Sequence, residues 1–211
     1  MHPPIKIKVC GITREADIEL ALSLGIDWLG INLYEPSPRS VALPQAMRLL
    51  KNIPAGKRVC VTVMPTLRQL QSFLNAGFDF IQVHCDFETP AHKVAEWSQT
   101  VSPSRLWLAP KLPPDHPFPE PLLPYADTFL VDTFSRHAYG GTGATGNWQQ
   151  FAQLRQHNSK KNWILAGGLN PDNIEAAIRQ STTHIVDVNS GVETSPGIKD
   201  AAKLRKLCGL L

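Results

Sequence analysis

Polar and ionisable side chains close several short apolar runs of this 211-residue chain. They are Cys10, Asn32, His84, Lys111, Asp132 and Asp187, with Arg39 in the loop after the second run. If the runs are parallel strands of one barrel, their carboxyl ends meet at one mouth, where a thiol, carboxyls and an imidazole could perform acid–base chemistry. Singly, each group has a simpler explanation, such as an inert core cysteine or a helix-capping aspartate. The set as a whole predicts an enzyme-like site.

The segment 164–200 predicts a phosphate-binding site. One apolar run ends in Gly167-Gly168 and the next in Asn189-Ser190-Gly191, and a helical segment is expected after each, from Pro171 and from about Ile198. Glycine-rich loops before helices present backbone N–H groups and positive helix ends to an anion. The alternative is two ordinary turns that need glycine for a positive φ. Because two such units follow one another, we favour a phosphate cup formed by Gly167, Gly168, Ser190 and Gly191.

Eight apolar runs alternate with helical segments along the chain. The runs are 5–12, 28–34, 58–64, 80–85, 105–112, 128–133, 163–166 and 184–188. Six prolines between Pro113 and Pro124 should leave the fifth helix missing or reduced to a turn, because proline removes a hydrogen-bond donor and disfavours helix before it. The pattern predicts an α/β fold, a single (β/α)8 TIM barrel domain over 1–211, and the strand count disfavours a doubly wound sheet.

Composition limits the partners. The net charge is +3 with scattered basic residues, which argues against a nucleic-acid partner and leaves anionic small molecules plausible. No apolar run approaches the roughly 20 residues of a membrane span, and the first residues lead straight into a strand without a signal peptide. The four cysteines form no C-x-x-C pair, which suggests free thiols and a cytoplasmic location.

Several motifs together resemble the phosphoribosylanthranilate isomerase family. They are KVCGIT at 8–13, SPRSV at 37–41, IQVH at 81–84, VDT at 131–133, GGTG at 140–143, LAGGLNPDN at 165–173 and DVNSGVETSPGIKD at 187–200. The resemblance runs from about Lys6 to Lys203. It implies a (β/α)8 barrel that converts N-(5-phosphoribosyl)anthranilate to its 1-deoxyribulose 5-phosphate isomer in tryptophan biosynthesis, without metal or cofactor.

The resemblance also implies residue roles for this Amadori rearrangement. Cys10 would be the general base and Asp132 the general acid, on opposite sides of the sugar. Cys10 would then need a pKa below its usual ~8.5, which cationic neighbours or helix dipoles could provide, and Asp132 would need desolvation to keep its proton. Arg39 would bind the anthranilate carboxylate. We assign His84 and Asp187 to binding or support, and Gly141 and Gly143 to a loop that closes over the substrate.

Three places depart from the family pattern. Residues 144–147 read Ala-Thr-Gly-Asn where the family usually has Lys-Thr-Phe-Asp, Asn32-Leu33 replaces an apolar–aromatic pair, and Asn189 replaces a serine. These departures bear on substrate affinity and on the aromatic substrate more than on the reaction.

Other readings stay open. A metal-dependent phosphosugar epimerase could use Cys10, His84, Asp132 and Asp187 as ligands, although the third run ends in Val63-Met64, which offers no such ligand. A barrel that binds a phosphorylated ligand without turnover is a second alternative. The G-x-G-x-x-G pattern at 141–146 is rejected as a dinucleotide site, because it begins eight residues after Thr133 and no acidic residue follows before Asp172. The protein could be a monomer or a homodimer.

Overall fold

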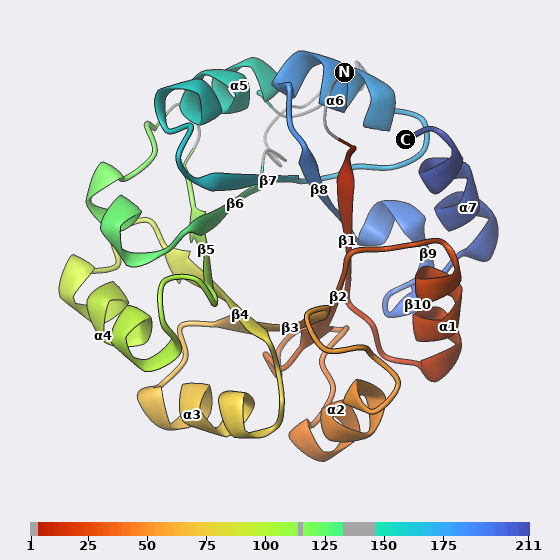
Figure 1. The fold of residues 1–211 in the computed structure, drawn as a ribbon, viewed down its shortest axis with the longest axis horizontal. Helices are drawn as coiled ribbons and strands as arrows, with labels where there is room; N and C mark the ends of the chain where they lie inside the picture. Colours follow the sequence, from red (N-terminus) through yellow and green to blue (C-terminus); the bar gives the residue numbers. More distant parts are fainter. Residues whose placement is uncertain (1–3, 114–115, 133–146) are drawn as a thin grey trace.

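A closed barrel of eight parallel strands forms the centre of the molecule (Figure 1). The computed structural model describes residues 4–113, 116–132 and 147–211. The strands are β1 (Lys6–Cys10), β2 (Trp28–Asn32), β3 (Arg58–Val63), β4 (Phe80–Asp86), β5 (Leu106–Lys111), β6 (Thr128–Asp132), β7 (Asn162–Ala166) and β8 (Ile185–Val188). They pair in chain order, with β8 returning to β1, so the predicted (β/α)8 barrel is confirmed.

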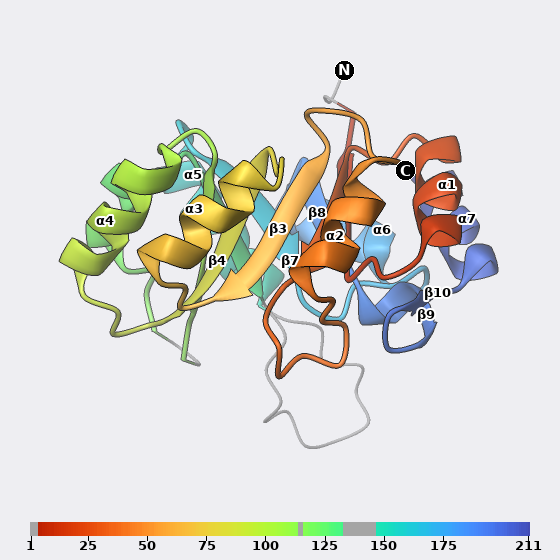
Figure 2. The ribbon, with the colours of Figure 1, turned by 90° about the horizontal axis from the view of Figure 1, so that it is seen from below.

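Helices surround this ring on its outside (Figure 1), and a side view shows β3 between α2 and α3 (Figure 2). They are α1 (Glu15–Ser23), α2 (Leu43–Leu50), α3 (Leu67–Asn75), α4 (Ala91–Val101), α5 (Trp148–His157), α6 (Ile174–Ser181) and α7 (Ala201–Gly209). Between β5 and β6 the described residues form only a 3-10 helix, Glu120–Tyr125, with Pro124 inside it. The predicted reduction of the fifth helix is thus confirmed. None of the helices in the described ranges has the length and apolar character needed to cross a membrane.

Two predicted helix starts are wrong. Pro171 lies in a turn, and α6 begins at Ile174, because the Asn170 side chain accepts a hydrogen bond from the Asp172 N–H and Asn173 accepts one from the Asn170 N–H. Ile198 belongs to β10 (Ile198–Lys199), which pairs antiparallel with β9 (Glu193–Ser195) in a hairpin beside α1 and α7 (Figure 1). Asp200 then caps α7 through the Ala202 and Lys203 N–H groups.

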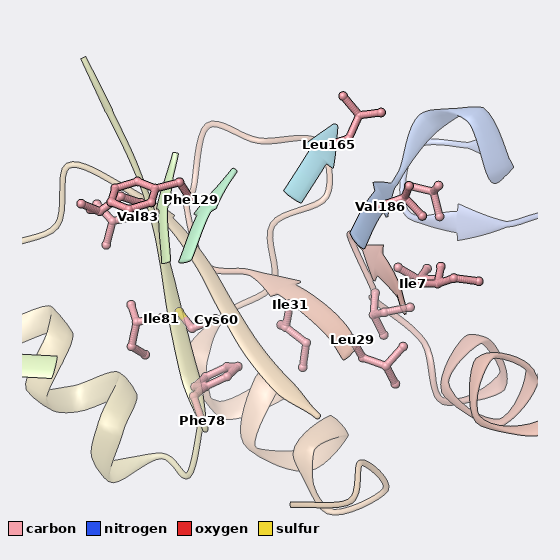
Figure 3. Close-up of a cluster of buried hydrophobic side chains, with 14 of the residues drawn as sticks. Ile7, Leu29, Ile31, Cys60, Phe78, Ile81, Val83, Phe129, Leu165 and Val186 are labelled. Atoms are coloured by element: carbon pink, nitrogen blue, oxygen red, sulfur yellow. The ribbon is translucent and has the colours of Figure 1, made fainter. Parts of the chain in front are cut away.

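Alternation along each strand separates an outer from an inner core. Ile7, Leu29, Ile31, Ile81 and Val186 belong to the buried apolar cluster shown in Figure 3, which lies between the strands and the helices. Because successive strand residues point to opposite faces, Lys8 and Cys10 share the opposite, inner face of β1. Burying each large aliphatic side chain of the outer layer contributes roughly 1.5–3 kcal/mol.

Aromatic rings fill the end of the barrel where the strands start. The Trp107 ring lies 5.4 Å from that of Trp28 and 5.0 Å from that of Phe80, measured between centroids. Trp28 and Phe80 are the first residues of β2 and β4. The inner apolar cluster continues from these rings to Cys10 and Ala166 at the far ends of β1 and β7. The polar inward-facing groups therefore gather at the C-terminal mouth.

Candidate active site

A buried ion pair crosses the seam where β8 meets β1. Lys8 and Asp187 are register partners, and Lys8 Nζ donates hydrogen bonds of 2.9 Å to both carboxylate oxygens of Asp187. The Lys8 side chain is fully buried and that of Asp187 is 8% exposed. Burial lowers the pKa of Lys8, but the charges of Asp187 and Cys10 outweigh this effect and the net shift is upward. Lys8 is thus a fixed cation inside the barrel.

Cys10 lies two residues beyond Lys8 on the same inner face of β1. A β-carbon on Gly30 would lie 3.2 Å from both Cys10 Sγ and Lys8 Cε, so the missing side chain at Gly30 leaves room for the thiol and the lysine to meet. Burial raises the pKa of the Cys10 thiol, and Lys8 and Lys199 only partly offset that rise. The expected depression of this pKa is therefore wrong for the free protein, where the thiol is the resting form.

Asp132 ends β6 at the same mouth, and its side chain is exposed. That desolvation keeps a proton on this carboxyl stays a prediction. Burial raises the pKa of Asp187, and the negative charge of Asp132 adds to this rise. The predicted acid is thus close enough to the Lys8–Asp187 pair to interact with it electrostatically.

His84 is a largely buried, neutral histidine. Its Nε2 lies 2.8 Å from Nε2 of Gln82, on the same face of β4. Burial, with a smaller contribution from the positive charge of Lys8, lowers the pKa of His84 to about 4. Gln82 is 1% exposed, and its Oε1 has no hydrogen-bond partner among the described residues. This pair offers uncharged polar groups to the mouth rather than a cation.

Arg39 is held by an acidic residue of the protein itself. Its Nε lies 3.0 Å from both carboxylate oxygens of Glu193, and its Nη2 lies 2.6 Å from Glu193 Oε2. Lys199 Nζ donates to the other oxygen, Oε1, at 2.8 Å and to Asn189 Oδ1 at 3.1 Å. Burial raises the pKa of Glu193, but Arg39 and Lys199 reverse this and leave it below its usual value. Arg39 is therefore not a free loop arginine.

Asn32 organises the loop that carries Arg39. Its Nδ2 donates to Ser37 Oγ at 3.0 Å, and the same oxygen accepts from the Arg39 N–H at 3.2 Å. Its Oδ1 accepts from the Tyr34 N–H at 2.8 Å. The side chain of Asn32, where the sequence departs from the family, thus stabilises the loop through hydrogen bonds. Asn189, where the sequence also departs from the family, accepts a hydrogen bond from Lys199.

The loops after β7 and β8 touch, as a shared cup requires. A β-carbon at Gly191 would lie 2.0 Å from the carbonyl oxygen of Leu169, so only glycine fits there. Gly167 and Gly168 have φ values of 102° and 63°, which favour glycine. Ser190 and Gly191 open a short 3-10 helix, Ser190–Val192, after β8. The loops that carry the predicted phosphate-binding residues are therefore brought together, and a 3-10 turn follows β8.

Three further residues of the site carry no role in the sequence analysis. Lys8, Glu193 and Lys199 lie inside quoted motifs, and Lys8 interrupts an apolar strand two residues before Cys10, a signal that could have identified it. Gly141, Gly143 and the departures at 144–146 lie outside the described residues. Within 4–113, 116–132 and 147–211, no group of three or more His, Cys, Asp or Glu side chains could hold a metal ion.

Several known proteins are similar to this chain in sequence and in fold. The family model for N-(5'phosphoribosyl)anthranilate (PRA) isomerase matches residues 7–209. The N-(5'-phosphoribosyl)anthranilate isomerase of Pelobacter propionicus is 38% identical over 205 residues, which cover 96% of this chain and 93% of that protein. The phosphoribosyl anthranilate isomerase structure from Thermotoga maritima has a TM-score of 0.79 at 28% identity and covers 96% of each chain. A further isomerase structure, in complex with reduced 1-(o-carboxyphenylamino)-1-deoxyribulose 5-phosphate, has a TM-score of 0.79 at 26% identity, covering 97% of this chain and 96% of its own.

Proposed function

Since this chain belongs to the N-(5'-phosphoribosyl)anthranilate isomerase family, and is an isomerase of tryptophan biosynthesis, we propose that Cys10 and Asp132 carry out its two proton transfers. The reaction converts N-(5'-phosphoribosyl)anthranilate to 1-(2-carboxyphenylamino)-1-deoxyribulose 5-phosphate. It needs a general acid at the ribose ring oxygen and a general base at the ribose C2. The observation that carries the proposal is a buried thiol beside Lys8 at the mouth where Asp132 ends β6.

Asp132 protonates the ring oxygen, and the ribose opens to a Schiff base. The exposed position of Asp132 allows it to take a proton from solvent. A bound substrate would cover the carboxyl and remove it from water, which favours its neutral, donating form.

Cys10 then removes the C2 proton, giving an enolamine that tautomerises to the ketone. Only the thiolate is a base, and burial disfavours it in the free protein. Lys8 and Lys199 act in the opposite direction, and the cationic Schiff base formed in the first step adds a further positive charge beside the thiol. The base is thus most effective after the ring has opened.

The remaining site residues bind and orient the substrate. Arg39 provides a guanidinium for the anthranilate carboxylate. Gly167, Gly168, Ser190 and Gly191 supply the phosphate cup, Gly141 and Gly143 belong to the covering loop, and His84 and Asp187 support the mouth. No step of this scheme requires a metal or an organic cofactor.

Turnover by the purified protein tests this function. We expect the fluorescence of freshly prepared phosphoribosylanthranilate to disappear at an unchanged rate when a chelator such as EDTA is present. Loss of activity in EDTA that returns with a divalent cation would favour the metal-dependent epimerase chemistry. Binding of the substrate without turnover would identify a barrel that only binds it.

We also propose the setting in which the enzyme works. The four cysteines are free thiols, three of them buried, which suits a reducing compartment such as the cytoplasm. The partner is the small phosphorylated substrate, with no nucleic acid, and the chain would act as one barrel domain over 1–211, as a monomer or a homodimer. Light scattering of the purified protein would distinguish the two assembly states.

A further inference from the structure

The β9–β10 hairpin is the only pair of strands outside the barrel among the described residues, and it reaches the substrate-binding loop of β2. Glu193 and Lys199 face each other across this hairpin as register partners. Glu193 contacts Arg39, which is 154 positions earlier in the chain. The hairpin thus links the loop after β8 to the loop after β2.

Glu193 is more buried and more fully bonded than a surface ion pair requires. Its side chain is 3% exposed, that of Lys199 is fully buried, and that of Arg39 is 19% exposed. Besides Arg39 and Lys199, the Gly197 N–H donates to Glu193 Oε1 at 3.2 Å. Charge-assisted bonds of this kind hold a guanidinium in a fixed direction, whereas exposed pairs contribute little.

The hairpin itself is fastened to the helices on either side. Thr13 Oγ1 donates to the Gly197 carbonyl at 2.5 Å, and the Lys199 N–H donates to Asp17 in α1 at 3.3 Å. Lys203 Nζ, in α7, donates to the Glu193 carbonyl at 2.9 Å. Supporting residues that are locked in this way keep a binding group in a precise orientation.

The arrangement leaves one end of Arg39 open to a ligand. Glu193 occupies the Nε and Nη2 edge, and no described residue accepts a hydrogen bond from Nη1. Two cationic side chains, Arg39 and Lys199, share the single carboxylate of Glu193. The cluster therefore keeps a surplus positive charge, which an anionic group of the substrate would balance.

We infer that Glu193, held in turn by Lys199, is a positioning residue that directs the outer end of the Arg39 guanidinium at the aromatic carboxylate of the substrate. This inference rests on the proposed function. Glu193 touches Arg39 and not the reacting atoms, so its effect on catalysis passes through substrate binding.

A double-mutant cycle tests the inference. The probe is reduced 1-(o-carboxyphenylamino)-1-deoxyribulose 5-phosphate, and its affinity is measured for wild type, Glu193→Gln, Arg39→Ala and the double variant. We expect Glu193→Gln to weaken binding roughly tenfold, consistent with loss of a charge-assisted bond, and to have no further effect once Arg39 is alanine. In steady-state assays Glu193→Gln should raise KM with kcat nearly unchanged.

A second probe separates positioning from general damage. The same reduced compound without its aromatic carboxylate should bind wild type and Glu193→Gln equally. Asp127→Asn, which removes a 3.5 Å ion pair with Lys161 just before β6, is the matched control and should leave both affinities unchanged. If Glu193→Gln does not fold, Glu193→Asp keeps the negative charge but shortens the side chain, which draws the carboxylate back from Arg39, and the same weakening is expected.

The outcomes are distinct. Equal weakening of both probes, full affinity of Glu193→Gln, or additive effects in the double variant would overturn the inference alone. Wild type that binds neither probe would overturn the proposed function and this inference with it.

Discussion

The positive charge of Lys8 interacts with several residues of the predicted site. It binds Asp187 directly, lowers the pKa of His84 and opposes the rise in the pKa of Cys10. Its effect on the thiol and on the imidazole has the same physical origin, because a fixed cation favours a nearby anion and disfavours a nearby cation.

His84 gives this electrostatic field a measurable consequence for stability. Its pKa is about 4 in the folded protein and 6.5 when unperturbed, so between these values the unfolded chain binds the proton more tightly. The stabilisation from neutral His84 is complete above pH 6.5 and is lost as the pH falls towards 4, in total about 3 kcal/mol. Between pH 7 and pH 4.5, the free energy of unfolding measured in urea should therefore fall more for wild type than for His84→Gln. An identical loss in the two proteins would show that His84 does not titrate as described.

Among the elements, the close contact between the loops after β7 and β8 holds the predicted phosphate cup together. Gly191→Ala places a β-carbon 2.0 Å from the Leu169 carbonyl oxygen and must separate the loops after β7 and β8. We expect a loss of stability of roughly 1–3 kcal/mol, as in other overpacked sites, and at least tenfold weaker binding of the reduced product analogue. Thermal melting and calorimetry measure the two effects.

Gly209→Ala is the matched control, because nothing lies within 4 Å of a β-carbon at that position. It should bind like wild type and melt at no lower temperature, because alanine favours a helix more than glycine does. Wild-type affinity in Gly191→Ala would contradict the phosphate cup.

The elements also show how far sequence reasoning can reach. The eight apolar runs between helical segments predict all eight strands, and the prolines predict the reduced fifth helix. Both patterns are local, since they depend only on residues that are neighbours in the sequence. The starts of α6 and α7 differ from the prediction, because the turn at Asn170 and the short hairpin from Glu193 to Lys199 leave no periodic pattern in the sequence. The motifs identify Cys10, Asp132 and Arg39 as candidate site residues. They cannot show that Glu193 binds Arg39, because that contact joins residues 154 positions apart and depends on the closed barrel. The raised pKa of Cys10 cannot be predicted from the sequence either, because it depends on how deeply the fold buries the thiol.

The whole molecule depends on closing β8 onto β1, and Lys8 and Asp187 lie inside that seam. Lys8→Met leaves the Asp187 carboxylate buried without its cation, so we expect a loss of roughly 3–5 kcal/mol in the free energy of unfolding. The double variant Lys8→Met/Asp187→Leu should recover part of that loss, because no uncompensated charge remains. Urea unfolding followed by tryptophan fluorescence measures both.

Lys206→Met is the control for this experiment. It removes a comparable ion pair, with Asp172, in which both side chains are exposed, and should leave stability unchanged. Wild-type stability in Lys8→Met would mean that the seam does not depend on its ion pair.

The most direct test of the account is turnover of phosphoribosylanthranilate by Cys10→Ala and Asp132→Asn, alongside Cys60→Ala. Cys60 is a buried cysteine of the outer core cluster, so it controls for removal of a thiol as such. Each of the first two variants should lose at least about 100-fold in kcat, as expected when a general acid or base is removed, yet still bind the reduced product analogue. Cys60→Ala should retain turnover. Turnover within tenfold of wild type in either Cys10→Ala or Asp132→Asn would contradict the assigned proton transfers.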